Sequence, residues 1–321
     1  MTLRILLAAA LVAVASTAWS QAYPNRPVRV IVPWPPGQAT DIAARVVAEK
    51  LQTALGQPFV ADNRPGAGGA IGTEAVAKSA PDGYTLLAGS SGPYSIMPNL
   101  QKTPYEPLKD FAPVSLICLT PFALVAHPSN PAKDAREFIA MVKAKPGEFT
   151  FASSGTGATA HLFAELFNAM AGIKARHVPY KGSVPALTDV MNGNVTYAVE
   201  TVAATQTHIK SGKLKAFGVT TATRAGAMPD LPPLAEAAGL AGYDAAAWIG
   251  YVAPAGTPRE IVQRLSSEMQ KVLATDELKS RLVALGLDAR SSTPDEMAAF
   301  LRREQERYGQ IIKAQNIKVE Q

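Results

Sequence analysis

The chain has little of several residue types that mark particular protein classes. Its 321 residues include a single cysteine, Cys118, which excludes a disulfide framework and a cluster of cysteine metal ligands. Charged residues make up 18% and hydrophobic ones 47%, a balance that excludes a disordered chain and a membrane-embedded one. The chain should fold as a globule, with Cys118 as a buried structural thiol inside the apolar run 114–119.

A concentrated basic charge is also lacking. The formal net charge is +5 over the whole chain. The densest basic stretch contains Arg302, Arg303 and Arg307, and it alternates with Glu304 and Glu306. Such alternation is typical of a solvated helix face, whereas nucleic-acid binders gather Lys and Arg into a stripe. We therefore expect no nucleic-acid partner.

Long hydrophobic runs are absent after the first twenty residues. Residues 1–20 combine a basic start at Arg4, an apolar run over 5–15 and a small-residue exit at 18–20. This pattern predicts a secretory signal peptide, because about eleven apolar residues are too few for a transmembrane helix of about twenty. We expect the rest of the chain to be exported and soluble. It should also be a monomer, since no exposed apolar stripe is evident.

Short β-branched runs alternate with helix-period segments, which predicts an α/β fold of mostly parallel sheets flanked by helices. The length suits two lobes. We expect lobe 1 to comprise residues 21–123 plus 247–321, and lobe 2 residues 124–246. The expected strands are 28–32, 59–61, 84–88, 114–118, 122–126, 149–152, 175–179, 195–199, 214–219 and 248–253. The expected helices are 40–55, 71–78, 134–145, 158–170, 185–192, 258–274, 276–285 and 294–315.

Two similar strand-loop-helix junctions are the most informative local feature. One is IVPWPPGQATDIAARVV, and the other is FTFASSGTGATAHLFAELF. The first turn of a helix has unpaired N–H groups and a partial positive charge, and glycine lets a ligand approach the backbone closely. A carboxylate could therefore bind between the two junctions without any arginine. The residues expected to face it are Gly37, Gln38, Ala39, Thr40, Ser154, Thr156, Gly157, Ala158 and Thr159.

Other chemistry-bearing motifs are incomplete. The glycine-rich stretch 66–72 has Ile71 where a dinucleotide fingerprint needs glycine, and no phosphate-binding GxxxxGK[ST] exists. The four histidines lack metal-ligand spacing, so we expect no metal and no cofactor. Ser90 and Ser154 lie outside any GxSxG elbow. One enzymatic alternative stays open, a secreted serine hydrolase with Ser154 as nucleophile and His161 as base.

Six blocks of the chain together resemble the Bug-type solute receptors of tripartite tricarboxylate transporters. They are YPNRPVRVIVPWPPGQATD, DNRPGAGGAIGTEAVAKSAPDGYTLL, KDFAPVSL, SSGTGATAHLFAELF, HVPYKGSVPALTDVMNG and WIGYVAPAGTP. The resemblance implies a two-lobed periplasmic binding protein of the type II-like kind, with the ligand cleft between the lobes. It implies a receptor that is not an enzyme and that passes a small carboxylate to membrane subunits of the transporter.

The resemblance also implies which residues bind the ligand. The departures from the family pattern are Gln38, in place of a second glycine, and Trp34, in place of Phe or Tyr. Glu200 is a third unusual residue, which would favour a cation or hydroxyl on the ligand. The full set of expected ligand-binding residues is Trp34, Gly37, Gln38, Ala39, Thr40, Asp41, Ser90, Ser154, Thr156, Ala158, Thr159, His161, Tyr180, Lys181 and Glu200.

The identity of the ligand stays open at this point. A dicarboxylate, tricarboxylate, aromatic acid or amino acid would each suit the expected site. Besides the hydrolase, a sensor subunit that binds the same ligand but signals to a membrane kinase is the remaining alternative, and the sequence does not separate it from a transport receptor.

Overall fold

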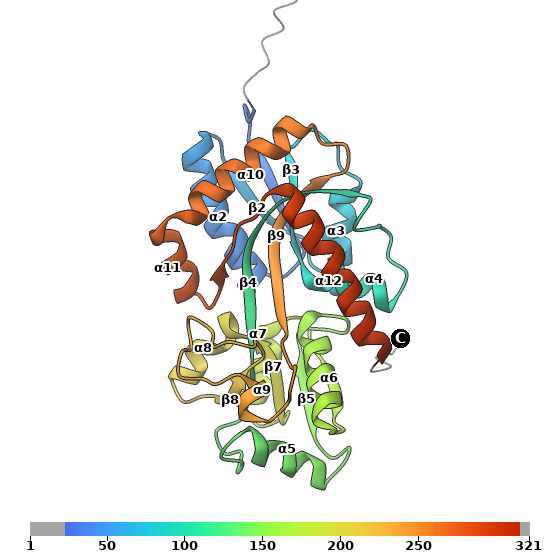
Figure 1. Cartoon of the computed structure of the whole chain (residues 1–321), viewed down its shortest axis with the longest axis vertical. Helices are drawn as coiled ribbons and strands as arrows, with labels where there is room; N and C mark the ends of the chain where they lie inside the picture. Colours follow the sequence, from blue (N-terminus) through green and yellow to red (C-terminus); the bar gives the residue numbers. More distant parts are fainter. Residues whose placement is uncertain (1–22, 315–321) are drawn as a thin grey trace, which may run out of the picture.

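A computed structural model describes residues 23–314, and the signal peptide expected at 1–20 lies outside them. The described chain forms two α/β lobes, one above the other in Figure 1, joined by long strands. The upper lobe contains β1 (Val28–Val32), α2 (Ala39–Leu55), β2 (Phe59–Asn63), η1 (Ala67–Gly69), α3 (Ala70–Ala77), β3 (Thr85–Ser90), η2 (Gly92–Ile96), α4 (Met97–Leu100), α10 (Arg259–Ala274), α11 (Asp276–Ala284), β10 (Asp288–Ala289) and α12 (Pro294–Ala314).

The lower lobe follows the same alternation of strands and helices. It contains α5 (Ala135–Ala144), β5 (Thr150–Ser153), α6 (Thr159–Ala171), β6 (Arg176–Pro179), α7 (Ser183–Met191), β7 (Tyr197–Thr201), α8 (Val202–Lys210), β8 (Lys215–Val219) and α9 (Leu234–Ala237). Two long strands, β4 (Phe111–Ala126) and β9 (Ala246–Pro254), connect the lobes. The two-lobed α/β class expected from the sequence is confirmed. Helices α8 and α9, strand β10 and the short helical segments η1, η2 and α4 were not expected.

The strands form one continuous sheet in the order β2-β1-β3-β9-β4-β7-β5-β6. Pairing is parallel where the outer strands of each lobe meet, in β2-β1-β3 and in β6-β5-β7. It is antiparallel where β4 and β9 are involved. Because parallel strands end at the same edge, the loops after β1 and β3 lie together in one lobe, and the loops after β5 and β7 lie together in the other.

Strand β4 corrects the expectation of two separate strands at 114–118 and 122–126. Its sixteen residues stay extended through Pro121. On one side of Pro121 the strand pairs with β10 through Leu119, and on the other it pairs with β7 from Phe122 onward. The missing proline N–H therefore falls where β4 changes partners, which is a position that tolerates proline.

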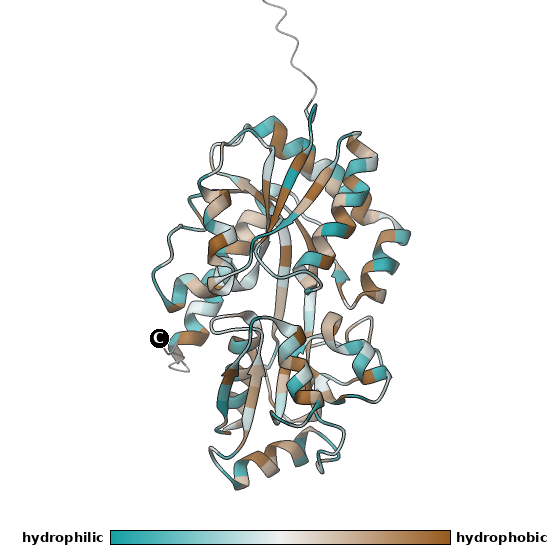
Figure 2. Ribbon diagram, turned by 180° about the vertical axis from the view of Figure 1, so that it is seen from behind, coloured by the Kyte–Doolittle hydropathy of each residue, from teal (hydrophilic) through white to brown (hydrophobic). Residues whose placement is uncertain are grey.

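Each lobe has its own hydrophobic core. Side chains of α2, α10 and α11 pack against the upper sheet, and aromatic residues of α5 and α6 pack against the lower one. Figure 2 shows hydrophobic segments along the central strands, with hydrophilic residues interspersed on the covering helices. Cys118 is buried as expected, and burial raises the pKa of its thiol to about 12. The thiol is thereby kept protonated at neutral pH.

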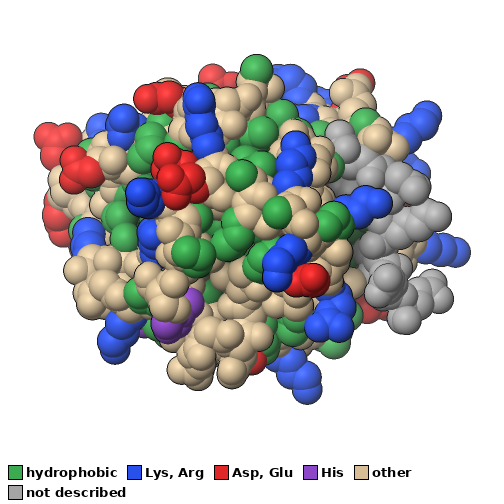
Figure 3. Space-filling model, turned by 90° about the horizontal axis from the view of Figure 1, so that it is seen from below, with side chains coloured by type: hydrophobic (Ala, Val, Ile, Leu, Met, Phe, Trp, Pro, Cys, Tyr) green, Lys and Arg blue, Asp and Glu red, His purple; other side chains and the backbone are tan. Residues whose placement is uncertain are grey.

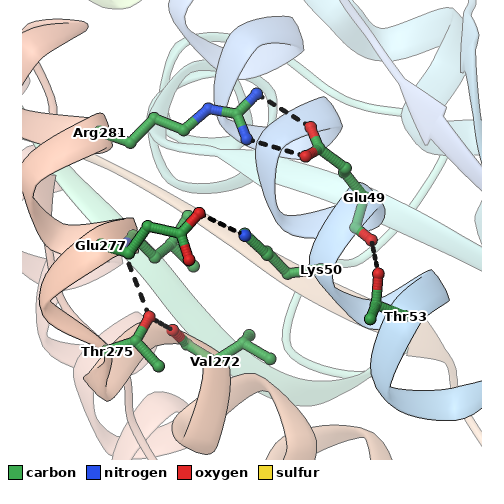
Figure 4. Close-up of polar contacts among 8 residues, drawn as sticks. Glu49, Lys50, Thr53, Val272, Thr275, Glu277 and Arg281 are labelled. Carbon is green, nitrogen blue, oxygen red and sulfur yellow. Dashed lines mark hydrogen bonds and ion pairs between the residues drawn. The ribbon is translucent and has the colours of Figure 1, made fainter.

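The C-terminal helices α10 and α11 pack against the upper lobe. Helix α11 lies against α2, where Arg281 forms a bidentate pair with Glu49 at 3.0 and 2.9 Å (Figure 4). Lys50 donates to Glu277 at 2.6 Å in the same contact, and Thr275 caps the start of α11. The final helix, α12, extends toward the lower lobe, and its Tyr308 belongs to the lower core.

Two surface observations complete the fold. Within residues 23–314, no helix has the length and apolar character needed to cross a membrane. On the described part of the face seen from below, Lys and Arg side chains are scattered among acidic and apolar ones (Figure 3). The basic residues of this face form no continuous stripe.

Candidate ligand-binding site

A small cavity of about 50 Å³ lies between the two lobes. Both lobes and both connecting strands contribute to its wall. The lining residues are Trp34, Gln38, Ala39, Thr40, Ser90, Thr120, Phe122, Ser154, Thr159, Ala160, Ser183, Glu200, Thr201, Ala247, Trp248 and Ile249.

Two helices from opposite lobes, α2 and α6, begin at this cavity without a side-chain cap, as does α7 of the lower lobe at Ser183. The N-cap residues of α2 and α6 are Gln38 and Ala158, and neither side chain accepts a hydrogen bond from the first turn. By contrast, Asp134 caps α5 and Thr201 caps α8 in the usual way. The N–H groups at the start of α2 and α6 are therefore available to an anion in the cavity.

The upper wall is held rigid by hydrogen bonds behind it. The Trp34 indole N–H donates to Ser90 Oγ at 2.9 Å, so both residues line the cavity as a fixed pair. The Asn63 amide donates to the Trp34 carbonyl at 2.9 Å. The same Asn63 amide also donates to Asp41, which ties the loop to α2. This loop presents a preformed surface to a ligand.

Glu200 is the acidic group of the lower wall. It lies at the end of β7 and is 2% exposed. Its Oε1 accepts from the Thr201 N–H at 2.7 Å. Burial raises the pKa of the Glu200 carboxyl, while the Thr201 N–H and the Ser183 hydroxyl act in the opposite direction. The site thus contains a carboxyl whose protonation depends on what shares the cavity with it.

A second, wider opening adjoins the cavity. Its wall includes Trp34 and Ser154, which it shares with the cavity, together with Thr156, Tyr180 and Lys181. The Tyr180 hydroxyl donates to Asp189 Oδ2 at 2.5 Å. The structure therefore places Tyr180 and Lys181 at the mouth of the site and not in the buried cavity.

Gly157 of the second junction and four of the fifteen expected ligand-binding residues, Gly37, Asp41, Ala158 and His161, line neither space in the described structure. Gly37 donates its N–H to Asp41, which also accepts from Arg45, each at 2.9 Å. Asp41 is therefore occupied in shaping the loop before α2. Ala158 and His161 lie at the start of α6, both buried behind the cavity wall. For these residues, the structure favours a supporting role over direct contact with a ligand.

The hydrogen bonds of the described residues do not join Ser154 to His161, as the hydrolase alternative would require. His161 Nδ1 instead accepts from the Gly157 N–H at 3.2 Å. The His161 ring stacks on His177 at 3.9 Å, and His177 Nε2 lies 2.7 Å from Ser153 Oγ. The two histidines therefore brace the loop between β5 and α6 from behind.

This histidine pair predicts a loss of stability in acid. Burial, followed by the charge of nearby His161, lowers the pKa of His177 from 6.5 to about 3. Between these values the unfolded chain binds more protons than the folded one, so stability falls as pH falls from 6.5 toward 3. Urea midpoints measured at pH 7, 5 and 4 should fall less steeply for His177→Gln than for the wild type. His127→Gln is the control, and equal slopes in all three proteins would contradict the prediction.

The lobes touch across the site at glycines. A Cβ added to Gly182 of the lower lobe would lie 2.7 Å from Gln38 Nε2, and one added to Gly157 would lie 2.3 Å from Met97 Sδ. Both glycines also have positive φ angles, of 117° and 75°. Larger residues would therefore strain the backbone and displace the Gln38 and Met97 side chains.

Several cavity residues were not found from the sequence. Thr120, Phe122, Trp248 and Ile249 come from β4 and β9, and Ser183 from the start of α7. The strands carry no local motif, and only their pairing brings them to the site. Among residues 23–314, no group of three His, Cys, Asp or Glu side chains is placed to hold a metal ion.

The two lobes, the shared strands and the cavity between helix starts define a two-lobed ligand-binding protein. The sequence profile of the tripartite tricarboxylate transporter family receptor matches residues 43–317. The chain belongs to this family of solute receptors, as the resemblance of its sequence blocks implied.

Relatives and solved structures agree with this assignment. The chain is 38% identical to protein BugT of Bordetella pertussis over 311 residues, covering 95% of this chain and 94% of BugT. It resembles the structure of Rhodopseudomonas palustris Rpa4515 with adipate at 34% identity and a TM-score of 0.89, covering 92% and 99% of the two chains. It also resembles the structure of MatC of R. palustris with bound malate, at 33% identity and a TM-score of 0.84, covering 90% of this chain and 100% of MatC.

Proposed function

We propose that this protein is an extracytoplasmic receptor that binds a small carboxylate between its lobes for uptake by a tripartite transporter. The observation that carries the proposal is the pair of uncapped helix starts, α2 and α6, at one buried cavity. Their N–H groups and partial positive charges suit a carboxylate, and no Lys, Arg or His belongs to the described lining.

The ligand carboxylate would be held mainly by the backbone. In this arrangement the N–H groups of Ala39 and Thr40 act from one lobe, and those of Thr159 and Ala160 act from the other. Trp34 supplies an apolar face beside them. The adipate and malate in two neighbouring structures are small carboxylic acids, which supports this class of ligand.

Binding would draw the lobes together by a hinge motion, with lobe 1 as residues 21–123 plus 247–321 and lobe 2 as residues 124–246. A periplasmic location would follow from the signal peptide expected at residues 1–20. The closed receptor would then dock as a monomer on the membrane subunits. An uptake assay in cells with and without this chain tests this delivery step.

The binding step is tested by thermal shift on protein that has been unfolded and refolded to remove any bound ligand. The panel comprises dicarboxylates, tricarboxylates, aromatic acids and amino acids. A ligand that binds only the folded state stabilises it by about 2.7 kcal/mol at 100 times its Kd, so one class should raise the melting temperature clearly. A flat response over the whole panel would remove the support for a carboxylate receptor.

A further inference from the structure

Three buried polar atoms of the cavity have no hydrogen-bond partner. They are Gln38 Nε2, Thr120 Oγ1 and Glu200 Oε2, in side chains that are 8%, 1% and 2% exposed. Among the described residues, six buried side-chain atoms lack a partner, and half of them lie in this one cavity. Buried polar groups are almost always paired, so this concentration points to a ligand with several polar groups of its own.

Of these three side chains, Glu200 has the highest cost of burial, because it can carry a charge. Its Oε1 accepts from the Thr201 N–H, whereas its Oε2 accepts no hydrogen bond of good geometry, although the Ser183 and Thr201 hydroxyls lie close enough to lower the pKa of the carboxyl. Of the sixteen described residues that line the cavity, Glu200 alone has an ionisable side chain. The ion pairs of residues 23–314 also do not include it. A buried carboxylate without a counter-charge is costly, so the ligand must either bring a cation or meet Glu200 in its protonated form.

The carboxylate expected at the helix starts decides between these possibilities. It adds a negative charge to a cavity that already contains Glu200 and no positive side chain. A second ligand carboxylate would bring a third such group into the same space. An ammonium group on the ligand would instead neutralise Glu200, and hydrogen bonds between charged groups are the stronger kind.

We propose that Glu200 determines specificity by pairing through Oε2 with an ammonium group of the ligand. The receptor would thus select an amino acid over the corresponding acid without the amino group. This inference rests on the proposed carboxylate-binding function. Gln38 completes the arrangement by donating its free amide N–H to a carboxylate oxygen, which fixes the direction in which the ligand lies.

The test compares acids that differ only at the substituent. Isothermal titration of the mature chain, as wild type and as Glu200→Gln, uses L-2-aminoadipate against adipate, and L-aspartate against succinate and L-malate. Glu236→Gln, an exposed change in the same lobe, is the control. The wild type should bind one of the amino acids at least about tenfold more tightly than its partners. Glu200→Gln should lose about 10- to 100-fold of that affinity, and Glu236→Gln none.

Glutamine has the shape of glutamate and a hydrogen-bond donor like that of protonated glutamate, but no negative charge. Glu200→Gln therefore tests the charge of Glu200 separately from its shape. If Glu200→Gln retains amino-acid affinity, the ion pair does not exist. Tighter binding of adipate, succinate or malate than of the amino acids would also overturn the ammonium proposal, while leaving the carboxylate receptor intact. If no acid binds to the wild type, the proposed function itself fails. The melting temperature of ligand-free Glu200→Gln should equal or exceed that of the wild type, because a buried unpaired carboxyl has been removed.

Discussion

Replacing Ala39 by aspartate should weaken ligand binding about 30- to 1,000-fold. Ala39 is the first residue of α2, is 7% exposed and lines the cavity. An aspartate there would place a fixed carboxylate where the ligand carboxylate is expected. Two like charges 4 Å apart repel by about 4 kcal/mol at an effective dielectric constant of 20, and about half of that remains at greater separation. Titration calorimetry with the best acid of the panel measures the loss.

Ala39→Asn is the matched control, since asparagine has the same shape without the charge. It should lose less affinity than the aspartate variant, and the difference between the two isolates the electrostatic part. The ligand-free aspartate variant should be no less stable than the asparagine variant, because an acidic residue in the first turn is favourable. Equal losses in both variants would mean that Ala39 matters only for its size, and would argue against an anion at the start of α2.

Ala39 belongs to the part of the site that could be predicted from the sequence. The two junctions have local signals, in which an apolar β-branched run, a loop with glycine or proline and a helix-period segment follow one another. These signals brought Gln38, Ala39, Thr40, Ser154 and Thr159 into the candidate set, and the structure places all five on one cavity. Backbone N–H groups at a helix start need no particular side chain, so recognising the helix is enough to locate them.

The direction of a side chain within a junction could not be predicted in the same way. Asp41 and His161 occupy the first turns of α2 and α6, close in sequence to residues that line the cavity. Asp41 turns back to Gly37 and Arg45, and His161 turns back to Gly157. Each choice depends on partners outside the local pattern, such as Asn63 and His177, which only the packed structure brings near.

The contribution of the connecting strands was hidden for a different reason. Thr120 and Trp248 reach the cavity because β4 and β9 pair antiparallel, with Leu119 opposite Trp248. These residues are more than a hundred positions apart, and neither strand carries a motif. Proline at 121 further suggested a break where the strand in fact continues. Long-range pairing of this kind follows from the packing of whole layers, which a local pattern does not encode.

Trp248→Ala should destabilise the protein by about 3 to 5 kcal/mol, the usual cost of removing a large buried aromatic side chain. Trp248 is fully buried on β9, and its ring lies edge-on to Tyr94 at 5.4 Å. Its indole N–H donates to Ser95 Oγ at 3.3 Å. The truncation therefore removes packing between the sheet and η2, and it also leaves a buried hydroxyl without its donor. Urea unfolding followed by far-ultraviolet circular dichroism measures the loss.

The number of transitions in this unfolding curve shows whether the two lobes unfold together. Since β4 pairs with β9 in one lobe and with β7 in the other, the lobes share a strand and should unfold together. Trp248→Ala should then lower the urea midpoint of a single transition and leave its slope unchanged. Trp248→Phe keeps one aromatic ring but loses the rest of the indole and its N–H, so a smaller loss than for Trp248→Ala, about 1 to 2 kcal/mol, is expected for it. Two separate transitions, of which Trp248→Ala moves only one, would show that the shared strand does not couple the lobes.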